Sequence, residues 1–363
     1  MKKYLRGSSP VLILFIFWRL GLALVEIFVS PLWPLRQGFL GPVSWANMDG
    51  VHYLSIVRNG YFQFEQAFFP LYPLLIKYLT SLTRIPSYII ALGISHTAFL
   101  AALVLLYNYL KEQNSKYPLW IILLLLLFPT SFFFASVYGE SLFLLFAVAA
   151  MYAAHKRLWI IAGIAGMLAS ATRLFGVFLF PVILLHYISE KKPKRLTDIA
   201  GISLIPFGLI AYMSYLWMNI GDPLAFFHAQ PAFGAGRSGS ALIFLPQVIW
   251  RYLKIFATVP FTDLVYQVAV FEILALVGGL LLCWQGWKEK NNRLYLLYSA
   301  AVLILPTLTG TLSSLPRYFL SAFPLFFVLG SMHNMRVKTV IAVIFGVLQV
   351  YFASAFLRGY FVA

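Results

Sequence analysis

Long apolar runs recur along the whole chain and are separated by short polar segments. No alternation of apolar and polar residues recurs, so the runs predict helices rather than strands. Since only helices and closed barrels satisfy their backbone hydrogen bonds in lipid, the pattern predicts an all-α polytopic membrane protein. Several runs are shorter than the roughly 20 residues that a straight crossing needs, which predicts broken or tilted helices. About eleven runs qualify as candidate transmembrane helices, near 10–32, 86–110, 117–137, 141–155, 157–172, 174–189, 197–219, 264–285, 294–311, 317–331 and 337–357.

The composition excludes a soluble domain and several kinds of site. Of the 363 residues, 61% are hydrophobic, 18% are aromatic and only 10% are charged, which lies outside the range of soluble globular proteins. The single cysteine, Cys283, lies in an apolar run, so disulfides and cysteine-based metal sites are excluded. We therefore expect residues 1–363 to form one integral-membrane domain.

The formal net charge of +16 is distributed unevenly along the chain. If the N-terminus is cytoplasmic, eleven spans place 11 of the 13 lysines on the cytoplasmic side. Cytoplasmic connections of membrane proteins carry an excess of lysine and arginine. The pattern therefore predicts a cytoplasmic N-terminus, and the positive charge requires no polyanionic partner such as nucleic acid. The cytoplasmic lysines are Lys2, Lys3, Lys111, Lys116, Lys156, Lys191, Lys192, Lys194, Lys288, Lys290 and Lys338.

The opposite face has two long connections, near 33–85 and 220–263. In the first, two prolines interrupt the segment 67–83, which predicts an interfacial or re-entrant helix rather than a straight span. In the second, the glycine-rich stretch 234–239 lacks a preceding strand, which predicts a flexible loop and argues against a nucleotide-binding motif.

These external connections contain candidate chemistry. A carboxylate at the membrane edge among aromatic residues, as Asp49 is, indicates a site, although an ordinary solvated loop is the alternative. Arginine suits bidentate binding of phosphate, and Arg173 and Arg317 each abut an apolar helix. Glu140 opens an apolar segment, where it could either stabilise a helix N-terminus or bind a substrate hydroxyl. The external charged residues include Arg36, Asp49, Arg58, Glu65, Glu140, Arg173, Asp222, Arg237, Arg251, Asp263 and Arg317.

Four blocks of sequence carry a resemblance to a known family. The first joins Asp49-Gly-Val-His-Tyr53 with Gly60-Tyr61 and Phe68-Phe-Pro-Leu-Tyr-Pro73. The others lie at 129–141 (Pro-Thr-Ser through Tyr-Gly-Glu-Ser), 169–176 (Ala-Ser-Ala-Thr-Arg-Leu-Phe-Gly) and 315–319 (Leu-Pro-Arg-Tyr-Phe). Together they resemble, in the same order, the motifs of the PIG-V (GPI mannosyltransferase 2) family of GT-C glycosyltransferases. The similarity extends over most of the chain.

The resemblance implies a GT-C-like fold and an enzyme that transfers a sugar, with mannose as the family's sugar, from a polyprenyl-phosphate carrier to an acceptor hydroxyl on the non-cytoplasmic face. An inverting transfer of this kind needs one general base, for which Asp49 is the candidate. The departing lipid phosphate needs its charge stabilised, and the expected donor-phosphate residues are Arg317, Arg173, His52 and Arg58. The expected substrate- or acceptor-binding residues are Glu140, Tyr138, Glu65, Tyr53, Tyr72, His228 and Gln230.

The sequence also bears on whether a metal is needed and in which membrane the protein lies. Carboxylates are scarce and no DxD-like pair occurs, so we expect catalysis without a metal, while one Mg²⁺ or Mn²⁺ held by Asp49 and Glu65 stays open. The expected partners are the polyprenyl-phosphate sugar donor, a glycolipid, protein or glycan acceptor, and the lipid bilayer. The chain contains no Asn-x-Ser/Thr sequence, which favours a prokaryotic plasma membrane over the endoplasmic reticulum.

Two other classes of function remain as alternatives. A transporter or flippase for a lipid-linked or anionic substrate would favour charged residues near mid-bilayer on several spans, whereas most acids here are predicted at one membrane face. A non-catalytic membrane scaffold would keep the fold without activity. The sequence favours the glycosyltransferase.

Overall fold

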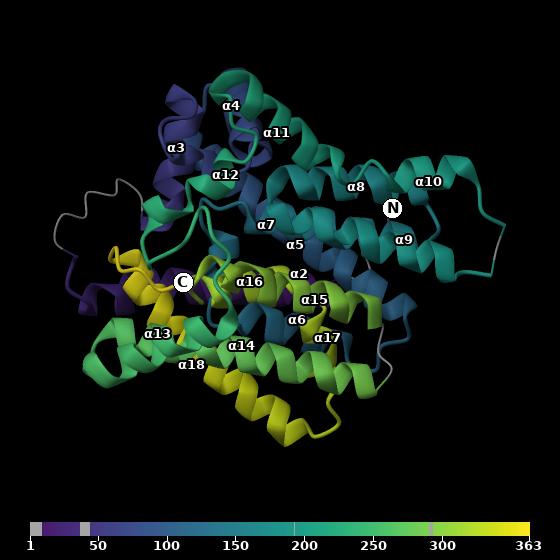
Figure 1. Ribbon diagram of the computed structural model, residues 1–363. Helices are drawn as coiled ribbons and strands as arrows, with labels where there is room; N and C mark the ends of the chain where they lie inside the picture. Colours follow the sequence, from purple (N-terminus) through teal and green to yellow (C-terminus); the bar gives the residue numbers. More distant parts are fainter. Residues whose placement is uncertain (1–8, 37–43, 192, 290–292) are drawn as a thin grey trace.

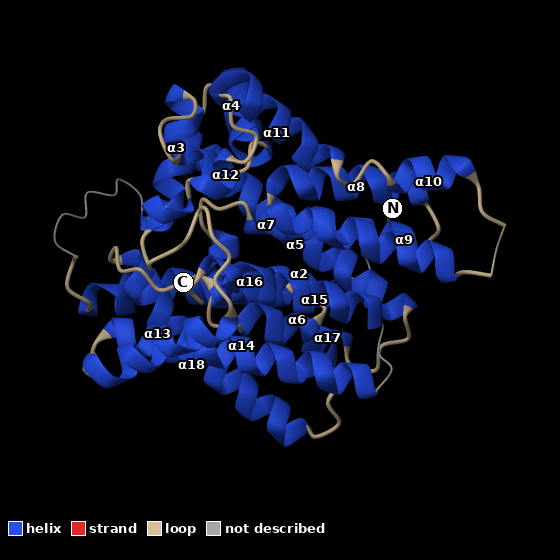
Figure 2. Ribbon diagram, viewed as in Figure 1, coloured by secondary structure: helices blue, strands red, loops and turns tan. Residues whose placement is uncertain are grey.

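The computed structural model describes residues 9–36, 44–191, 193–289 and 293–363. Within these ranges the chain forms 17 α-helices and no strand (Figure 2). The α-helices are α2 (Ser9–Leu24), α3 (Asp49–Asn59), α4 (Leu71–Thr83), α5 (Ser87–Glu112), α6 (Pro118–Leu127), α7 (Glu140–His155), α8 (Trp159–Thr172), α9 (Leu179–Ser189), α10 (Leu196–Ile202), α11 (Phe207–Ile220), α12 (Ala225–His228), α13 (Leu245–Thr258), α14 (Leu264–Lys288), α15 (Arg293–Ile304), α16 (Leu315–Ser321), α17 (Leu325–Ser331) and α18 (Met335–Leu357).

Every predicted apolar segment contains helix. Among the described residues, four helical segments are long and apolar enough to cross a membrane: Ser9–Leu32, Ser87–Glu112, Leu264–Lys288 and Met335–Leu357. The pair α10 and α11 is a fifth candidate, bent by 51° at the break between its helices. The other predicted spans correspond to shorter helices. The chain is thus an all-helical integral membrane protein, and the count of eleven crossings stays a prediction.

Several helices are interrupted at one common end of the bundle. α6 ends shortly before Pro129 and leads into a 3-10 turn at Ser131–Ala135. α8 ends before Arg173, whose extended backbone leads into a second 3-10 turn at Leu174–Phe178. α15 ends before Pro306 in the same way. Proline removes a backbone donor and ends a helix, so the sequence itself supplies two of these breaks.

The backbone after α6 is irregular and buried, so its carbonyl groups need hydrogen-bond partners within the protein. Gln349 of α18 supplies them. Its side-chain amide donates to the carbonyls of Leu126, at 2.8 Å, and Phe128, at 3.1 Å. A polar residue in the last long helix therefore makes the break at Pro129 tolerable within the bundle.

Glycines allow the α10–α11 pair to pack directly on α8. A Cβ on Gly163 of α8 would overlap the carbonyl oxygen of Gly201 in α10, and a Cβ on Gly208 of α11 would overlap the backbone of α8. On α11, the Tyr212 hydroxyl donates to the carbonyl of Gln66 at 2.7 Å. The close helix packing thus holds the first external connection in place.

That first connection contains two helices, α3 and α4. α4 occupies the segment 67–83 in which a helix was expected, and it begins directly after Pro70. The exposed side chains of Leu74, Tyr78 and Leu82 follow each other at helical spacing along α4, as in a helix that lies on a membrane surface. The interfacial or re-entrant placement stays a prediction, and α3 was not predicted.

The second external connection is more ordered than its glycine content indicated. It contains α12, a 3-10 turn at Gln230–Phe233 and the 14-residue helix α13. The glycine-rich stretch 234–239, expected to be a flexible loop, is bonded to the segment after α15, since the Ser238 N–H donates to the Thr309 carbonyl at 2.7 Å. This bond brings the two segments together beside the interrupted helix ends.

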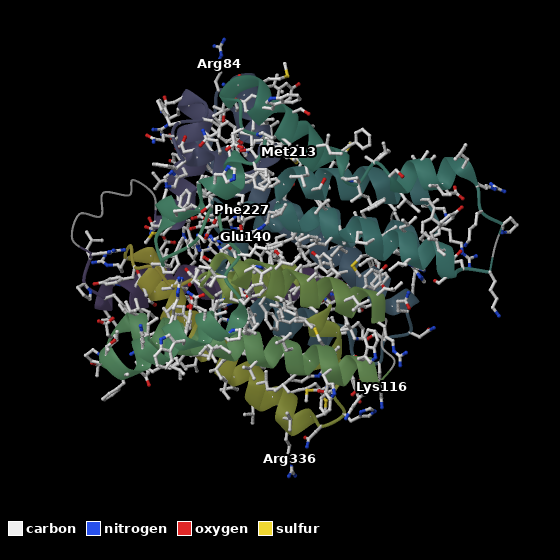
Figure 3. All side chains as sticks on the ribbon, viewed as in Figure 1. Arg84, Lys116, Glu140, Met213, Phe227 and Arg336 are labelled. Carbon is white, nitrogen blue, oxygen red and sulfur yellow. The ribbon has the colours of Figure 1, made fainter. Side chains whose placement is uncertain are left out.

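The two kinds of connection lie at opposite ends of the bundle. α3, α4, α12 and the C-terminus lie at the left of Figure 1, and the connections after α5, α9 and α14 lie at the right. Lys116 lies toward the right-hand end and Glu140 toward the other (Figure 3). This segregation agrees with the expected orientation, which stays a prediction. The lysines Lys2, Lys3, Lys192 and Lys290 lie outside the described residues.

Candidate active site

A cavity of about 360 Å³ lies among the external connections and the interrupted helix ends. Two carboxylates line it, from Asp49 and Glu140, together with three guanidinium groups, from Arg173, Arg237 and Arg317. Aromatic residues form much of the remaining wall: Tyr53, Phe68, Phe69, Phe175, Phe178, Phe226, Phe227, Phe233, Tyr318 and Phe361. The cavity therefore offers both charged groups and apolar surface to a ligand.

Asp49 is the first residue of α3, and a buried tyrosine fixes the turn before it. The Tyr138 hydroxyl donates to the carbonyl of Asn47 at 2.9 Å and accepts the backbone N–H of Asp49 at 3.2 Å. The Asn47 amide donates to the carbonyl of Phe356 at 2.6 Å. Met48 has a φ of +52°, which is unusual for a residue other than glycine. This constrained turn directs the Asp49 carboxylate into the cavity.

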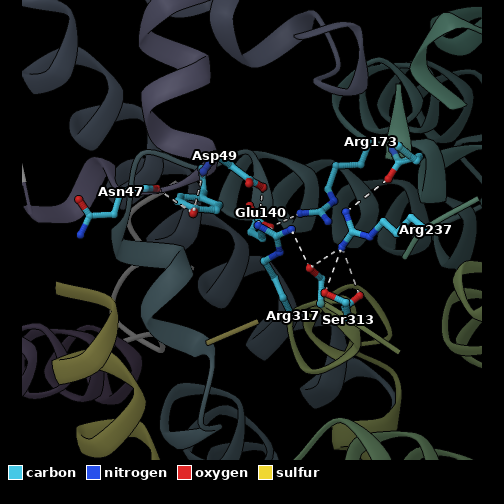
Figure 4. Close-up of polar contacts among 10 residues, drawn as sticks. Asn47, Asp49, Glu140, Arg173, Arg237, Ser313 and Arg317 are labelled. Atoms are coloured by element: carbon cyan, nitrogen blue, oxygen red, sulfur yellow. Dashed lines mark hydrogen bonds and ion pairs between the residues drawn. The ribbon is translucent and has the colours of Figure 1, made fainter. Parts of the chain in front are cut away.

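Asp49, Glu140 and two arginines form one connected network (Figure 4). Arg317 Nη1 donates to Asp49 Oδ2 at 2.5 Å, and its Nε lies 3.6 Å from Glu140 Oε1. Arg173 Nη1 pairs with the same oxygen of Glu140. Glu140 and Arg317 are only 2% and 7% exposed. Charges this deeply buried are tolerated when they are paired.

Glu140 fits both roles that the sequence left open. It is the first residue of α7, where the helix dipole stabilises an acid. Its second carboxylate oxygen, Oε2, is buried and has no hydrogen-bond partner within the described part of the chain. An unsatisfied buried acceptor beside a cavity is suited to a ligand hydroxyl.

The third guanidinium of the cavity, from Arg237, was not assigned to the site from the sequence. Arg237 Nη2 donates to Ser314 Oγ at 3.1 Å, and Nη1 donates to Gln230 Oε1 at 3.5 Å. The sequence shows only an arginine in a glycine-rich external stretch. Its place in the cavity depends on the fold-back of this stretch onto the residues after α15, and no local pattern signals that contact.

Of the predicted site residues, those that line the cavity are Asp49, His52, Tyr53, Glu140, Arg173, Gln230 and Arg317. His52 Nδ1 lies 3.4 Å from Glu65 Oε1, and its ring stacks on Phe68 with centroids 5.1 Å apart. His52 thus has an acidic partner other than Asp49. Burial raises the pKa of Tyr53 well above its usual value, so its hydroxyl stays protonated.

Two of the tyrosines expected to bind substrate are instead buried and do not line the cavity. Tyr138 supports the turn before Asp49 and does not line the cavity. Tyr72 is fully buried, and its hydroxyl bonds to the carbonyl of Ala91 at 3.0 Å and to Ser95 Oγ at 2.8 Å. Both hydroxyls are therefore occupied by the protein itself.

Three further predicted residues also lie outside the cavity lining. Glu65 is buried, and its carboxylate accepts the backbone N–H of Phe62 at 3.0 Å. Arg58 lines a separate depression on the surface. His228 donates to Asp222 at 2.7 Å, and this hydrogen bond lowers the pKa of Asp222. These three side chains therefore do not line the cavity.

Residues 28–189 match the model of a family described as mannosyltransferase (PIG-V). Over this stretch the chain is similar to the PIG-V mannosyltransferases. The resemblance expected from the sequence blocks is thereby confirmed, and together with the apolar helices it supports a membrane glycosyltransferase. The PIG-V match contains Asp49, Glu140 and Arg173, and it ends before Arg237 and Arg317. No curated protein matches the chain.

The sequence left open one metal ion held by Asp49 and Glu65, and only one of these two carboxylates lines the cavity. Asp49 lines the cavity, whereas the Glu65 carboxylate is buried outside its lining. In the part of the chain that the structure describes, no group of three or more His, Cys, Asp or Glu side chains could hold a metal ion. Metal-independent catalysis stays a prediction.

Proposed function

We propose that the chain is an inverting glycosyltransferase that moves a sugar, mannose by its family, from a polyprenyl-phosphate carrier to an acceptor hydroxyl at the non-cytoplasmic face. The observation that carries this proposal is a single cavity in which the Asp49 carboxylate lies beside three guanidinium groups and aromatic walls. A base for the acceptor, positive charge for the lipid phosphate and apolar surface for sugar and lipid are the groups that this reaction requires.

Asp49 is the proposed general base. The acceptor oxygen attacks the anomeric carbon from the face opposite the lipid phosphate, and its proton passes to the Asp49 carboxylate. A new bond forms between that oxygen and the sugar carbon, while the bond between the sugar carbon and the phosphate oxygen breaks. The lipid phosphate leaves with the bonding electrons. The hydrogen bond from Arg317 fixes the orientation of the carboxylate.

The guanidinium groups are proposed to stabilise the departing phosphate. Preorganised donors in a site that excludes water are effective at stabilising developing charge. Three arginines face two carboxylates in the cavity lining, so the balance of charge is positive and suits an anionic donor. Arg173 and Arg317 were expected in this role, and His52 also reaches the cavity.

We propose that residues 1–363 form a single integral-membrane domain and that the reaction takes place in it. The two long connections that line much of the cavity contain only two lysines, Lys77 and Lys254, which supports a non-cytoplasmic active site. The lipid carrier would reach the cavity from the bilayer. A prokaryotic plasma membrane is the proposed location.

The role of Asp49 as general base can be tested by measuring sugar transfer in an Asp49→Asn variant. Purified full-length protein is given a mannosyl polyprenyl phosphate, EDTA and a panel of glycolipid, peptide and glycan acceptors. We expect wild-type transfer in EDTA and a loss of about 100- to 10,000-fold in the variant, with donor binding retained because asparagine still accepts from Arg317. Equal turnover in both forms would refute the role of Asp49. Donor movement across vesicles without a new glycosidic bond would support a transporter instead.

A further inference from the structure

The three arginines of the cavity differ in their acidic partners. Arg317 contacts both Asp49 and Glu140, and Arg173 contacts Glu140. Arg237 has no carboxylate oxygen of the described residues within ion-pair distance. The buried carboxylate of Glu272 in α14 feels its charge from further away, and that carboxylate accepts a hydrogen bond from the Tyr252 hydroxyl. Two guanidinium groups are thus in direct contact with carboxylates, whereas the N–H groups of Arg237 bind only neutral oxygens.

Three of the four hydrogen bonds of Arg237 are long, and all four lead to neutral acceptors. They reach Gln230 Oε1 at 3.5 Å, the Ser313 carbonyl at 3.5 Å, Ser313 Oγ at 3.4 Å and Ser314 Oγ at 3.1 Å. Strong bonds from N–H groups to oxygen are shorter, about 2.7 to 3.2 Å. A phosphate oxygen would form shorter, charge-assisted bonds with the same N–H groups.

The backbone around Arg237 is held in position. Arg251 of α13 donates through Nη1 to the carbonyls of Gly236, at 3.0 Å, and Gly310, at 2.8 Å. This clamp joins the glycine-rich stretch to the turn before Ser313 and Ser314. Arg237 is therefore preorganised against the two serines, so little order has to be gained when a ligand binds.

One hydroxyl marks the place where an anion would sit. Ser314 Oγ accepts from Arg237 Nη2 at 3.1 Å and from Arg317 Nη2 at 3.4 Å, as the dashed lines of Figure 4 show. An oxyanion beside this hydroxyl would contact both guanidinium groups. The other amino group of Arg317, Nη1, remains on Asp49.

We propose that Arg237, together with the hydroxyls of Ser313 and Ser314, is the principal binding group for the phosphate of the lipid-linked donor. Arg173 and Arg317 then chiefly hold the two carboxylates in place. The proposal rests on the glycosyltransferase function proposed above. Its physical basis is that a phosphate competes with Asp49 and Glu140 for Arg317 but displaces only neutral acceptors at Arg237.

The test compares Arg237→Gln and Arg237→Lys with Arg84→Gln, in full-length purified protein. Arg84 is exposed and points away from the bundle (Figure 3), so its variant removes the same charge at a distance from the cavity. The probes are a polyprenyl monophosphate and the matching uncharged polyprenol. We expect Arg237→Gln to weaken binding of the phosphate about 10- to 100-fold, with polyprenol binding unchanged.

Lysine should restore part of the affinity, because it supplies the charge without the planar fork. In transfer assays, we expect Arg237→Gln to raise the donor KM more than it lowers kcat. Arg84→Gln should match the wild type in both measurements.

Unchanged affinity for the polyprenyl monophosphate in folded Arg237→Gln would overturn this inference and leave the proposed function intact. A wild-type protein that neither binds this lipid nor transfers sugar would instead refute the proposed function. Thermal unfolding checks that each variant is folded. If Arg237→Gln does not fold, Arg237→Met repeats the test with an apolar side chain of similar length.

Discussion

Arg317 and Asp49 are 268 residues apart in the chain, yet Arg317 Nη1 lies 2.5 Å from Asp49 Oδ2. The contact joins α16, near the end of the chain, to the start of α3 in the first external connection. The same guanidinium also holds Glu140. One buried cation therefore fixes both carboxylates of the cavity.

Removal of the Arg317 guanidinium should destabilise the protein as well as impair transfer. Arg317→Gln leaves the Asp49 and Glu140 carboxylates close together without their shared cation, and breaking a buried pair in this way costs about 3–5 kcal/mol. The free energy of unfolding in detergent measures the effect. Arg84→Gln is the control, for which we expect a change below about 0.5 kcal/mol. Equal stability of the two variants would contradict the network.

Phenylalanine variants of two buried tyrosines, Tyr138 and Tyr72, can show whether Tyr138 positions the Asp49 carboxylate or only stabilises the fold. Tyr138→Phe removes the bonds to the Asn47 carbonyl and the Asp49 N–H, so we expect kcat to fall about tenfold with little change in the donor KM. Tyr72→Phe removes a similar number of bonds away from Asp49. It should lower stability by about 1 kcal/mol and leave kcat unchanged. The same kcat in both variants would argue against a positioning role for Tyr138.

We expect a side chain at the glycine contact between α8 and α10 to lower the stability of the protein. A Cβ on Gly163 would overlap the Gly201 carbonyl, so we expect Gly163→Ala to cost about 1–3 kcal/mol of unfolding free energy. A Cβ on Gly93 of α5 would meet no neighbouring segment of the described chain within 4 Å, and Gly93→Ala should be neutral or stabilising by up to about 1 kcal/mol. Thermal unfolding of the two variants, which add the same methyl group, checks the packing.

Single cysteines can test the orientation of the chain. In a Cys283→Ser background, Ser81→Cys lies in the first external connection and Gln113→Cys lies at the end of α5, and both positions are exposed. A membrane-impermeant maleimide should label Ser81→Cys in intact cells. It should label Gln113→Cys only after the membrane is permeabilised. The reverse pattern would place the cavity in the cytosol and remove the basis for a lipid-linked donor at the external face.

Much of the helical framework and part of the site could be predicted from the sequence, because the signals are local. Apolar runs must be helical in lipid whatever their neighbours are, and every predicted segment does contain helix. The shortness of several runs predicted broken or tilted helices. Asp49, Arg173 and Arg317 were chosen because charge next to an apolar helix is costly unless it has a role, and all three line the cavity.

The sequence by itself thus determined the class of fold, the lysine asymmetry and the family, since composition and short motifs carry that information. The tertiary structure alone decided which side chains meet. In the folded chain, the hydroxyls of Tyr72 and Tyr138 bond to backbone carbonyls and do not line the cavity. Glu65 pairs with His52, and Arg237 lies in the cavity lining. The physical reason is that these contacts depend on how bent helices and glycine-lined interfaces pack across the bundle, and no spacing along the chain encodes a contact between segments so far apart.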